Sequence, residues 1–165
     1  IEDKFPQIFS KETAYQMTSI LEGVVRRGTG KNLRDLKLDI GGKTGTTNNN
    51  TDAWFIGFTS KLAIGVYVGS DNPKPLGKNE TGAKAALPIF KDFIKNGIKK
   101  EEARPFKVAD NILMMIVDPL TGQKARFESK TTIIESYKKN AVGDKSLANL
   151  EINNRLKNNN ILKFY

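Results

Sequence analysis

Five consecutive residues of this chain combine a cation, hydroxyl groups and a glycine. They are Lys43, Thr44, Gly45, Thr46 and Thr47. A lysine ammonium attracts anions, threonine hydroxyls donate hydrogen bonds, and a glycine lets another backbone approach closely. The segment therefore predicts a site at the edge of a sheet that binds a carboxylate and stabilises an oxyanion.

Several other chemistries are excluded by composition and spacing. The sequence has no Cys and no His, which removes thiol nucleophiles, disulfides, histidine bases and the usual zinc ligands. A phosphate-binding Walker loop needs Gly-x4-Gly-Lys-Ser/Thr. The two candidate segments, at Gly42 and at Gly30, both lack the first glycine of that loop. Lys37 occupies its position before Gly42, and Val25 occupies its position before Gly30. Any proton transfer must therefore use Lys, Asp, Glu or Tyr.

Three strands are predicted to position the motif, at about 40–47, 53–59 and 62–69. Ser60-Lys61 is predicted to form the tight turn between the second and third strands. Small residues would let a helix approach one face of these two strands closely; they are Gly57, Ala63, Gly65 and Gly69.

Two helices are predicted around the strands. The first begins after Ser10 as its N-cap and ends at Gly28, which we expect in a left-handed C-terminal cap. Residues 31–39 are predicted to be a polar loop. The second helix is predicted at about 83–98, with Pro88 in its first turn because proline cannot donate a backbone hydrogen bond.

At this point the sequence resembles the penicillin-binding proteins, specifically the C-terminal part of the transpeptidase domain of the bifunctional (class A) peptidoglycan synthases. The resemblance covers about residues 10–123 and does not extend beyond them. The matching strings, in the order of the family, are Thr13-Ala14-Tyr15-Gln16-Met17, Val24-Val25-Arg26-Arg27-Gly28-Thr29-Gly30, Gly42-Lys43-Thr44-Gly45-Thr46-Thr47, Asp52-Ala53-Trp54-Phe55-Ile56-Gly57, Val66-Tyr67-Val68-Gly69, Thr81-Gly82, Ala86-Leu87-Pro88-Ile89-Phe90 and Val117-Asp118.

The resemblance implies an α+β fold, a partial β-lactamase/transpeptidase-like three-layer αβα arrangement. This chain would supply the last three strands of an antiparallel sheet, with flanking helices. Residues 1–123 would form the C-terminal portion of the domain, and residues 124–165 a basic, Asn/Lys-rich, weakly structured tail. Because the chain opens with Ile1 rather than Met, we expect a fragment or a processed product. Two strands, a helical subdomain, a glycosyltransferase domain and a membrane anchor would precede it.

The reaction implied by the resemblance is D,D-transpeptidation in peptidoglycan synthesis. A serine attacks the penultimate D-alanine carbonyl of a stem peptide ending in D-Ala-D-Ala, D-alanine leaves, and an amine of a neighbouring peptide takes the acyl group. β-Lactams would mimic that peptide end and trap the acyl-enzyme. The resemblance implies no metal, no organic cofactor and no nucleic acid. It places the protein at the inner (cytoplasmic) membrane, on the periplasmic, extracytoplasmic face.

The resemblance also implies roles for the motif. Lys43 would hold positive charge and organise hydroxyls and proton transfers. Thr44 and Thr46 would bind the terminal carboxylate of the substrate, and the backbone N–H of Thr46 would supply half of an oxyanion hole. Gly45 would permit close approach of the substrate, and Thr47 would belong to the substrate-binding segment and support the residues that contact the substrate.

Asp52 is expected where the second strand begins, and Trp54 is expected in the core.

The nucleophilic serine of the family lies in a Ser-x-x-Lys pattern, which is followed along the chain by Ser-x-Asn and then by Lys-Thr-Gly. Here Ser136-Tyr137-Lys138-Lys139 and Ser70-Asp71-Asn72 match the first two patterns, but both follow Lys43, which is the wrong order. We therefore expect the chain alone to be inactive.

Two other classes of function stay open. One is a serine hydrolase of the same fold, a D,D-carboxypeptidase or β-lactamase. The other is a non-catalytic basic binding module, since the net charge is +9 and the chain lacks the expected nucleophile. Basic and aromatic residues do not alternate as a surface for stacking nucleotides would require.

Overall fold

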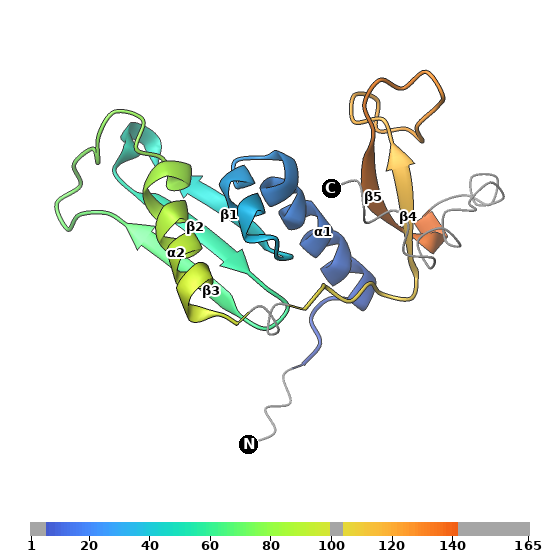
Figure 1. Ribbon diagram of the computed structural model, residues 1–165, viewed down its shortest axis with the longest axis horizontal. Helices are drawn as coiled ribbons and strands as arrows, with labels where there is room; N and C mark the ends of the chain where they lie inside the picture. Colours follow the sequence, from blue (N-terminus) through green and yellow to red (C-terminus); the bar gives the residue numbers. More distant parts are fainter. Residues whose placement is uncertain (1–5, 100–103, 142–165) are drawn as a thin grey trace. The chain divides into compact units, whose positions relative to one another are not determined.

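The structure is a computed structural model that describes residues 6–99 and 104–141 (Figure 1). The chain divides into two compact units, which we describe separately. One unit comprises Met17–Lys107. The other combines the residues up to Gln16 with those from Val108 onward. Helix α1 (Lys11–Arg27) contributes residues to both.

The first unit contains a three-stranded antiparallel sheet in the order β1-β2-β3 (Figure 1). Its strands are β1 (Gly41–Thr46), β2 (Ala53–Phe58) and β3 (Ala63–Val68). The turn between β2 and β3 closes with a 2.8 Å hydrogen bond from Thr59 N to Leu62 O. The three predicted strands and the predicted hairpin turn are confirmed, with ends that differ by one residue.

Helical segments accompany the strands. They are η1 (Lys31–Leu36), a 3₁₀ helix; η2 (Asn48–Asn50), a 3₁₀ turn; η3 (Gly82–Ala86), a π-helical turn; and α2 (Leu87–Gly97). Of these, η3 and α2 pack against the sheet. The prediction of a loop at 31–39 is wrong for η1. The predicted second helix is confirmed and Pro88 lies in the first turn of α2, but the helix is preceded by the π turn.

The start and the end of α1 are as predicted, but the conformation of Gly28 is not. Ser10 Oγ accepts a hydrogen bond from Thr13 N at 3.2 Å, which is an N-cap contact. Gly28 does not have the predicted left-handed conformation, because the described glycines with positive φ are Gly77 and Gly122. A Cβ atom on Gly28 would lie 2.9 Å from Val24 O. Val24 is four residues earlier, and its carbonyl accepts the Gly28 N–H at 3.0 Å, so the tight last turn, not a left-handed φ angle, leaves little room for a side chain at Gly28.

The core of this unit lies between α2 and one face of the sheet. The rings of Phe55 and Phe90 meet edge to face with centroids 4.8 Å apart, and both side chains are fully buried. Other buried members come from α1, η1, β2, η3 and α2 and from the residue before β1: Val25, Leu33, Ile40, Ala53, Ala86, Leu87 and Ile94.

The predicted small-residue face is confirmed at one glycine and wrong elsewhere. A Cβ atom on Gly57 would lie 2.6 Å from Phe90 Cζ, so α2 does approach closely there. Gly57, however, pairs with Ile64, and Ile56 pairs with Gly65. Paired residues of neighbouring strands point to the same face, so Ala63 and Gly65 lie on the opposite, exposed face.

The second unit contains a β-hairpin formed by β4 (Ile112–Val117) and β5 (Ile133–Lys138), followed by the short η5 (Lys139–Ala141). Its small core comprises Leu113, Met115 and Val117, with Ile133 and Tyr137 packed against them. A turn follows β4, with hydrogen bonds from Leu120 N to Asp118 Oδ1 and from Gly122 N to Asp118 O, both 2.8 Å.

The hairpin crosses the predicted boundary between the domain, residues 1–123, and the tail, residues 124–165. β4 lies in the predicted domain and β5 in the predicted weakly structured tail, yet the two strands pair along their whole length. The prediction of weak structure is therefore wrong for Ile133–Lys138, where polar Glu135 and Ser136 obscure the strand pattern. Residues 142–165 of the predicted tail lie outside the described residues.

The fold class is α+β, with antiparallel sheets and flanking helices, as predicted. Within the described ranges, no helix is long and apolar enough to cross a membrane.

Candidate active site

The predicted motif occupies β1, an edge strand of the described sheet. Lys43 is exposed, and its Nζ donates a 2.8 Å hydrogen bond to the carbonyl oxygen of Thr44. In an antiparallel pair, residues that exchange hydrogen bonds alternate with residues that do not. Thr47 N donates to Asp52 O at 3.1 Å. The N–H of Thr46 and the carbonyl of Thr44 therefore point away from β2, toward the free edge.

The two threonine hydroxyls of the motif contact other segments of the same unit. Thr44 Oγ1 and Thr29 Oγ1 are 2.9 Å apart and share a hydrogen bond. Thr46 Oγ1 accepts a 3.0 Å hydrogen bond from Gly82 N. Because that bond uses only a lone pair of Thr46, the hydroxyl proton of Thr46 is still able to donate to a ligand.

Gly82 places the start of η3 against the motif. A Cβ atom there would collide with the carbonyl oxygen of Trp54 and would lie 3.1 Å from Gly45 N. Those neighbours are backbone atoms of paired strands, which cannot move aside independently. A glycine at this position is therefore required for η3 to reach the hydroxyl of Thr46.

Asp52 lies where β2 begins and binds three hydroxyl groups. Its carboxylate accepts hydrogen bonds from Tyr67 Oη at 2.8 Å, Thr51 Oγ1 at 3.0 Å and Thr47 Oγ1 at 3.2 Å. The hydrogen bond from Tyr67, followed by that from Thr51, lowers the pKa of the Asp52 carboxyl. The same bond is the main cause that raises the pKa of the Tyr67 phenol. The predicted place of Asp52 at the strand entry is confirmed.

Trp54 is not in the core of the described residues. Its side chain is 41% exposed, and its ring lies 4.6 Å from that of Tyr67 on the open face of the sheet. The prediction of a core position is wrong because Trp54 alternates with Phe55, and it is Phe55 that faces α2.

The two serine patterns lie on elements unsuited to the family's arrangement. Ser136 is a buried residue in the middle of β5, and Lys139 follows in η5. A serine and a lysine three residues apart share a face on a helix but not on a strand. Ser70 is an exposed residue beyond the end of β3.

Sequence reasoning did not assign Thr29, Gly82 or Tyr67 to the site. All three lie in strings that match the family, so a signal for them was present. What the strings did not give is the contact of each residue, such as the register that places Tyr67 opposite Trp54.

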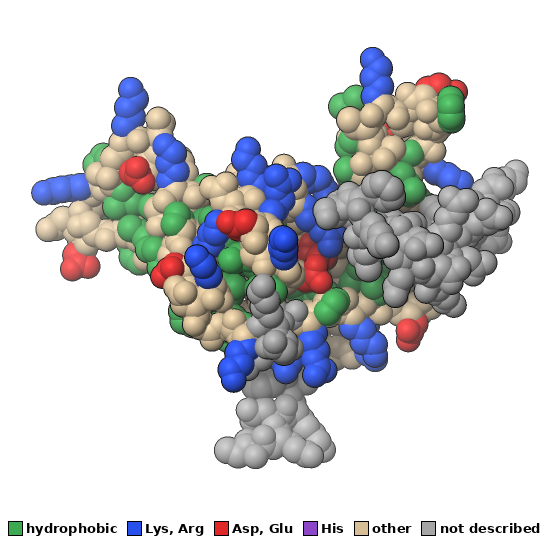
Figure 2. Space-filling view, in the orientation of Figure 1, with side chains coloured by type: hydrophobic (Ala, Val, Ile, Leu, Met, Phe, Trp, Pro, Cys, Tyr) green, Lys and Arg blue, Asp and Glu red, His purple; other side chains and the backbone are tan. Residues whose placement is uncertain are grey.

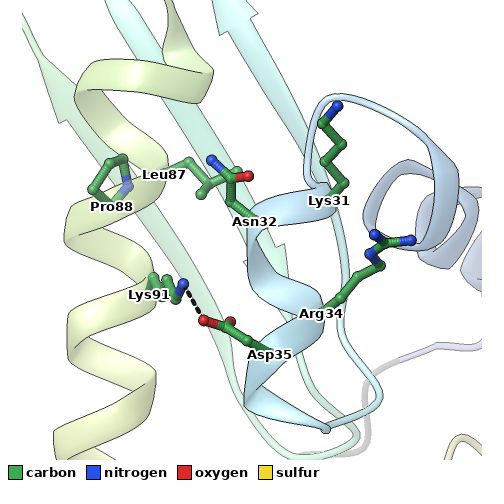
Figure 3. Close-up of a pocket in the computed structure, with 7 residues that line it drawn as sticks. All are labelled: Lys31, Asn32, Arg34, Asp35, Leu87, Pro88 and Lys91. Carbon is green, nitrogen blue, oxygen red and sulfur yellow. Dashed lines mark hydrogen bonds and ion pairs between the residues drawn. The ribbon is translucent and has the colours of Figure 1, made fainter.

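A separate pocket of about 440 Å³ lies between η1 and α2 (Figure 3). Its lining includes none of the motif residues: Lys31, Asn32, Arg34, Asp35, Leu87, Pro88 and Lys91. Lys91 forms an ion pair with Asp35 at 2.6 Å, and the hydrogen bond from Lys91 is the main cause that lowers the pKa of the Asp35 carboxyl. Figure 2 shows other Lys and Arg side chains crowded over η1 and the end of α1.

Potential metal ligands do not gather in this structure. Among residues 6–99 and 104–141 there is no group of three or more Asp or Glu side chains placed to hold a metal ion. The site therefore consists of a lysine, hydroxyls and backbone groups at a free strand edge.

The family model that matches this chain is the penicillin-binding protein transpeptidase domain, over residues 4–95. The match covers more than half of the chain and includes the whole motif. The chain therefore belongs to the penicillin-binding transpeptidase family, and the predicted resemblance is confirmed.

Individual relatives point to one kind of protein in that family. The chain is 42% identical over 158 residues to Penicillin-binding protein 1A of Rickettsia conorii, covering 96% of this chain and 19% of the relative. It is 38% identical to Penicillin-binding protein 1A of Pseudomonas aeruginosa, covering 80% of this chain and 16% of that relative. The chain thus spans about a fifth of the length of the relatives that it matches.

A solved structure gives the same result for the fold. The crystal structure of Penicillin-Binding Protein 1A from Haemophilus influenzae matches with a TM-score of 0.69 and 31% identity, covering 79% of this chain and 21% of that one. The alignment to the Rickettsia conorii relative also leaves at most seven residues of this chain unmatched. The prediction that residues 124–165 have no family resemblance is therefore wrong.

Proposed function

We propose that this chain contributes the Lys-Thr-Gly strand to a serine-type D,D-transpeptidase that cross-links peptidoglycan. The nucleophilic serine would come from a part of the domain outside this sequence, so the chain alone would be inactive. The observation that carries the proposal is the free edge of β1, where the Lys43 ammonium and the outward-pointing Thr46 N–H lie three residues apart.

An oxyanion needs donors that are already in place before charge develops. The N–H of Thr46 meets this requirement, because Thr47 N is bonded to β2 and so fixes the direction of the preceding residue. In the reaction, the serine oxygen forms a bond to the penultimate D-alanine carbonyl carbon. The bond to the leaving D-alanine nitrogen breaks after that nitrogen gains a proton. Lys43 would organise this proton transfer and hold positive charge beside the oxyanion.

The hydroxyls of Thr44 and Thr46 would bind the terminal carboxylate of a D-Ala-D-Ala stem peptide or the carboxylate of a β-lactam. The proximity of Thr29 adds a third hydroxyl at this place. Gly45 would let the substrate backbone lie along β1, and Thr47 would hold the end of the strand. The relatives are named penicillin-binding proteins, and we expect the whole protein to bind penicillin as well. It would act on the extracytoplasmic face of the inner membrane.

The experiment compares this chain alone with a chimera. In the chimera, the chain replaces the matching segment of the Rickettsia conorii relative. Each protein is incubated with a fluorescent penicillin and analysed by denaturing electrophoresis and peptide mass spectrometry. We expect no adduct on the chain alone and a stoichiometric adduct on a serine of the relative's part in the chimera.

Lys43→Ala in the chimera should slow acylation by about 10²-fold, because a preorganised charge at the oxyanion is lost. Lys61→Ala is the matched control, since Lys61 is an exposed lysine in the turn between β2 and β3. An adduct on Ser136 or Ser70 would contradict the proposal. So would a folded Lys43→Ala chimera that reacts at the parental rate.

A further inference from the structure

The connection between β1 and β2 is held by a cluster of hydrogen bonds centred on the Asp52 carboxylate. Oδ1 accepts from Tyr67 Oη at 2.8 Å, and Oδ2 accepts from Thr51 Oγ1 at 3.0 Å. Asp52 N also donates to Thr47 Oγ1 at 2.8 Å. One side chain therefore ties the residue after β1, the start of β2 and the end of β3 together.

The directions of these hydrogen bonds follow from counting protons. An ionised carboxylate only accepts, and each hydroxyl has one proton to donate. Thr47 Oγ1 lies 2.8 Å from Thr51 Oγ1 and 3.2 Å from Asp52 Oδ2. Thr47 shares its proton between Thr51 Oγ1, the nearer acceptor, and Asp52 Oδ2. Thr51 donates to Asp52, so the series ends on the carboxylate.

Tyr67 is held in place from three sides. Its ring lies against Trp54, the residue paired with it on β2, with centroids 4.6 Å apart. Its hydroxyl is bonded to Asp52. A Cβ atom on Gly69 would collide with that hydroxyl, so the glycine leaves the room that the contact needs. Tyr67 thus anchors Asp52 to the sheet.

The connection that Asp52 closes contains an unfavourable backbone. Asn49 and Asn50 have φ angles of 65° and 54°, in the left-handed region. Asparagine tolerates this region better than most residues, but two in succession still cost free energy. The chain adopts this conformation because the surrounding contacts favour it, and the Asp52 cluster supplies the side-chain part of them.

We propose that Asp52, anchored by Tyr67, is a positioning residue that fixes Thr47 and so directs the Thr46 N–H toward the free edge of β1. Asp52 does not touch the reacting atoms in this arrangement. It acts through Thr47: the carboxylate reaches Thr47 Oγ1 directly at 3.2 Å and through Thr51. The backbone of Asp52 adds two bonds, since its carbonyl accepts from Thr47 N and its N–H donates to Thr47 Oγ1. Tyr67 and Gly69 extend the same support to β3.

The charges of the cluster agree with this role. The pKa of Asp52 is lowered, mainly by the hydrogen bond from Tyr67, and the pKa of Tyr67 is raised, mainly by the bond to Asp52. The ionised carboxylate and the protonated phenol therefore coexist near neutral pH. The charge of Asp71 adds a smaller contribution to the raised pKa of Tyr67.

The first experiment uses this chain and does not depend on the proposed function. Amide NMR spectra are recorded for the parent, Asp52→Asn and Tyr67→Phe, and the Tyr67 phenol is titrated in the parent and in Asp52→Asn. Asp71→Asn is the matched control, because Asp71 acts on Tyr67 through its charge alone. We expect the Thr46 and Thr47 amides to shift in both test variants. The Tyr67 pKa should fall toward 10.0 in Asp52→Asn and change less in Asp71→Asn.

The second experiment rests on the proposed function and uses the chimera described above. For penicillin, the acylation rate constant and the dissociation constant of the non-covalent complex are measured separately. Asp52→Asn should lower the rate constant by about 10-fold to 10²-fold, as displacement of a catalytic group by about 1 Å does. The dissociation constant should stay within about twofold, because the carboxylate-binding hydroxyls are untouched. Tyr67→Phe should show a smaller decrease of the same kind.

The outcomes separate the two proposals. Unchanged Thr46 and Thr47 amides in Asp52→Asn would overturn the positioning role, whatever the chimera does. In the chimera, an effect of Lys43→Ala without an effect of Asp52→Asn would also overturn it, while the proposed function would stand. A chimera that is insensitive to Lys43→Ala would contradict the proposed function instead. If Asp52→Asn lowers the acylation rate constant, the affinity for penicillin and the melting temperature together, the variant is generally destabilised, and the positioning role is overturned.

Discussion

The two faces of the β1-β2-β3 sheet differ sharply, although they are made by alternate residues of the same strands. On the face toward α2, Ala53 and Phe55 are 0% exposed. On the other face, Trp54 is 41% and Ile56 is 55% exposed. Apolar side chains therefore occur on both faces, but in the described residues only one face is covered.

The candidate site draws on both faces at the free edge of β1. Thr44 pairs with Phe55 and Thr46 with Ala53, so their hydroxyls lie on the face toward α2 and η3. Lys43 pairs with Ile56 and Gly45 with Trp54, so both project from the open face. Substitutions of the buried apolar residues on the covered face should therefore change stability. Those on the open face and at the edge should change reactivity or association.

The largest effect is expected on the covered face. Phe90→Ala should lower the free energy of unfolding by about 3–5 kcal/mol, because it leaves a cavity against Phe55. Phe93, on the same helix, is 51% exposed, so Phe93→Ala should cost far less. Chemical denaturation of this chain measures both. Equal losses would show that the faces are not distinct.

At the free edge, Thr46→Pro should slow penicillin acylation of the chimera by about 10²–10³-fold, the value of one oxyanion donor. Thr46→Ala keeps the backbone N–H, so its effect should be smaller and should fall mainly on affinity for the ligand carboxylate. Circular dichroism checks folding, since proline can also disturb a strand. If both variants react alike, the Thr46 N–H is not an oxyanion donor.

Two glycines on neighbouring strands offer a matched test of the faces. Gly57→Ala should destabilise the chain by about 1–3 kcal/mol, because the added methyl group overpacks against Phe90. In Gly65→Ala the new atom would meet only Ile56 Cγ1, at 4.0 Å, and stability should stay within about 0.5 kcal/mol of the parent. Thermal unfolding distinguishes them, and the reverse order would contradict the assignment of faces.

On the open face, the exposed apolar residues and the unpaired strand edge should make the chain self-associate. Ile56→Lys should then raise the fraction of monomer, with little change in stability, as measured by sedimentation velocity. A parent chain that is already a monodisperse monomer with a sharp unfolding transition would contradict this prediction.

The smallest effect concerns pH. The Asp52 carboxyl has a pKa below its ordinary 3.8, mainly because Tyr67 donates to it. Its contribution to stability is therefore fully present above that value and is lost as pH falls through the lower pKa of the folded state. The stability difference between the parent and Asp52→Asn should shrink as pH is lowered below about 4. A constant difference would exclude the contribution.

The sequence by itself determined the motif, its family and the local elements around it. The strand pattern, Ser10 and Pro88 were sufficient because each acts through its immediate neighbours: alternation of side chains, a cap on the first turn, and a missing backbone donor. Lys43 to Thr47 were identified as candidate site residues for the same reason, since their types and spacing lie within one short segment.

Only the tertiary structure decided which faces and which distant residues take part. The register placed Gly65 on the exposed face. The strand at Ile133–Lys138 became visible through its pairing with β4. Thr29 and Gly82 reach the motif from positions 15 and 36 residues away, and Tyr67 reaches Asp52 from 15 residues away. Contacts of that kind depend on how strands align and helices cross, and no local pattern in the sequence encodes them.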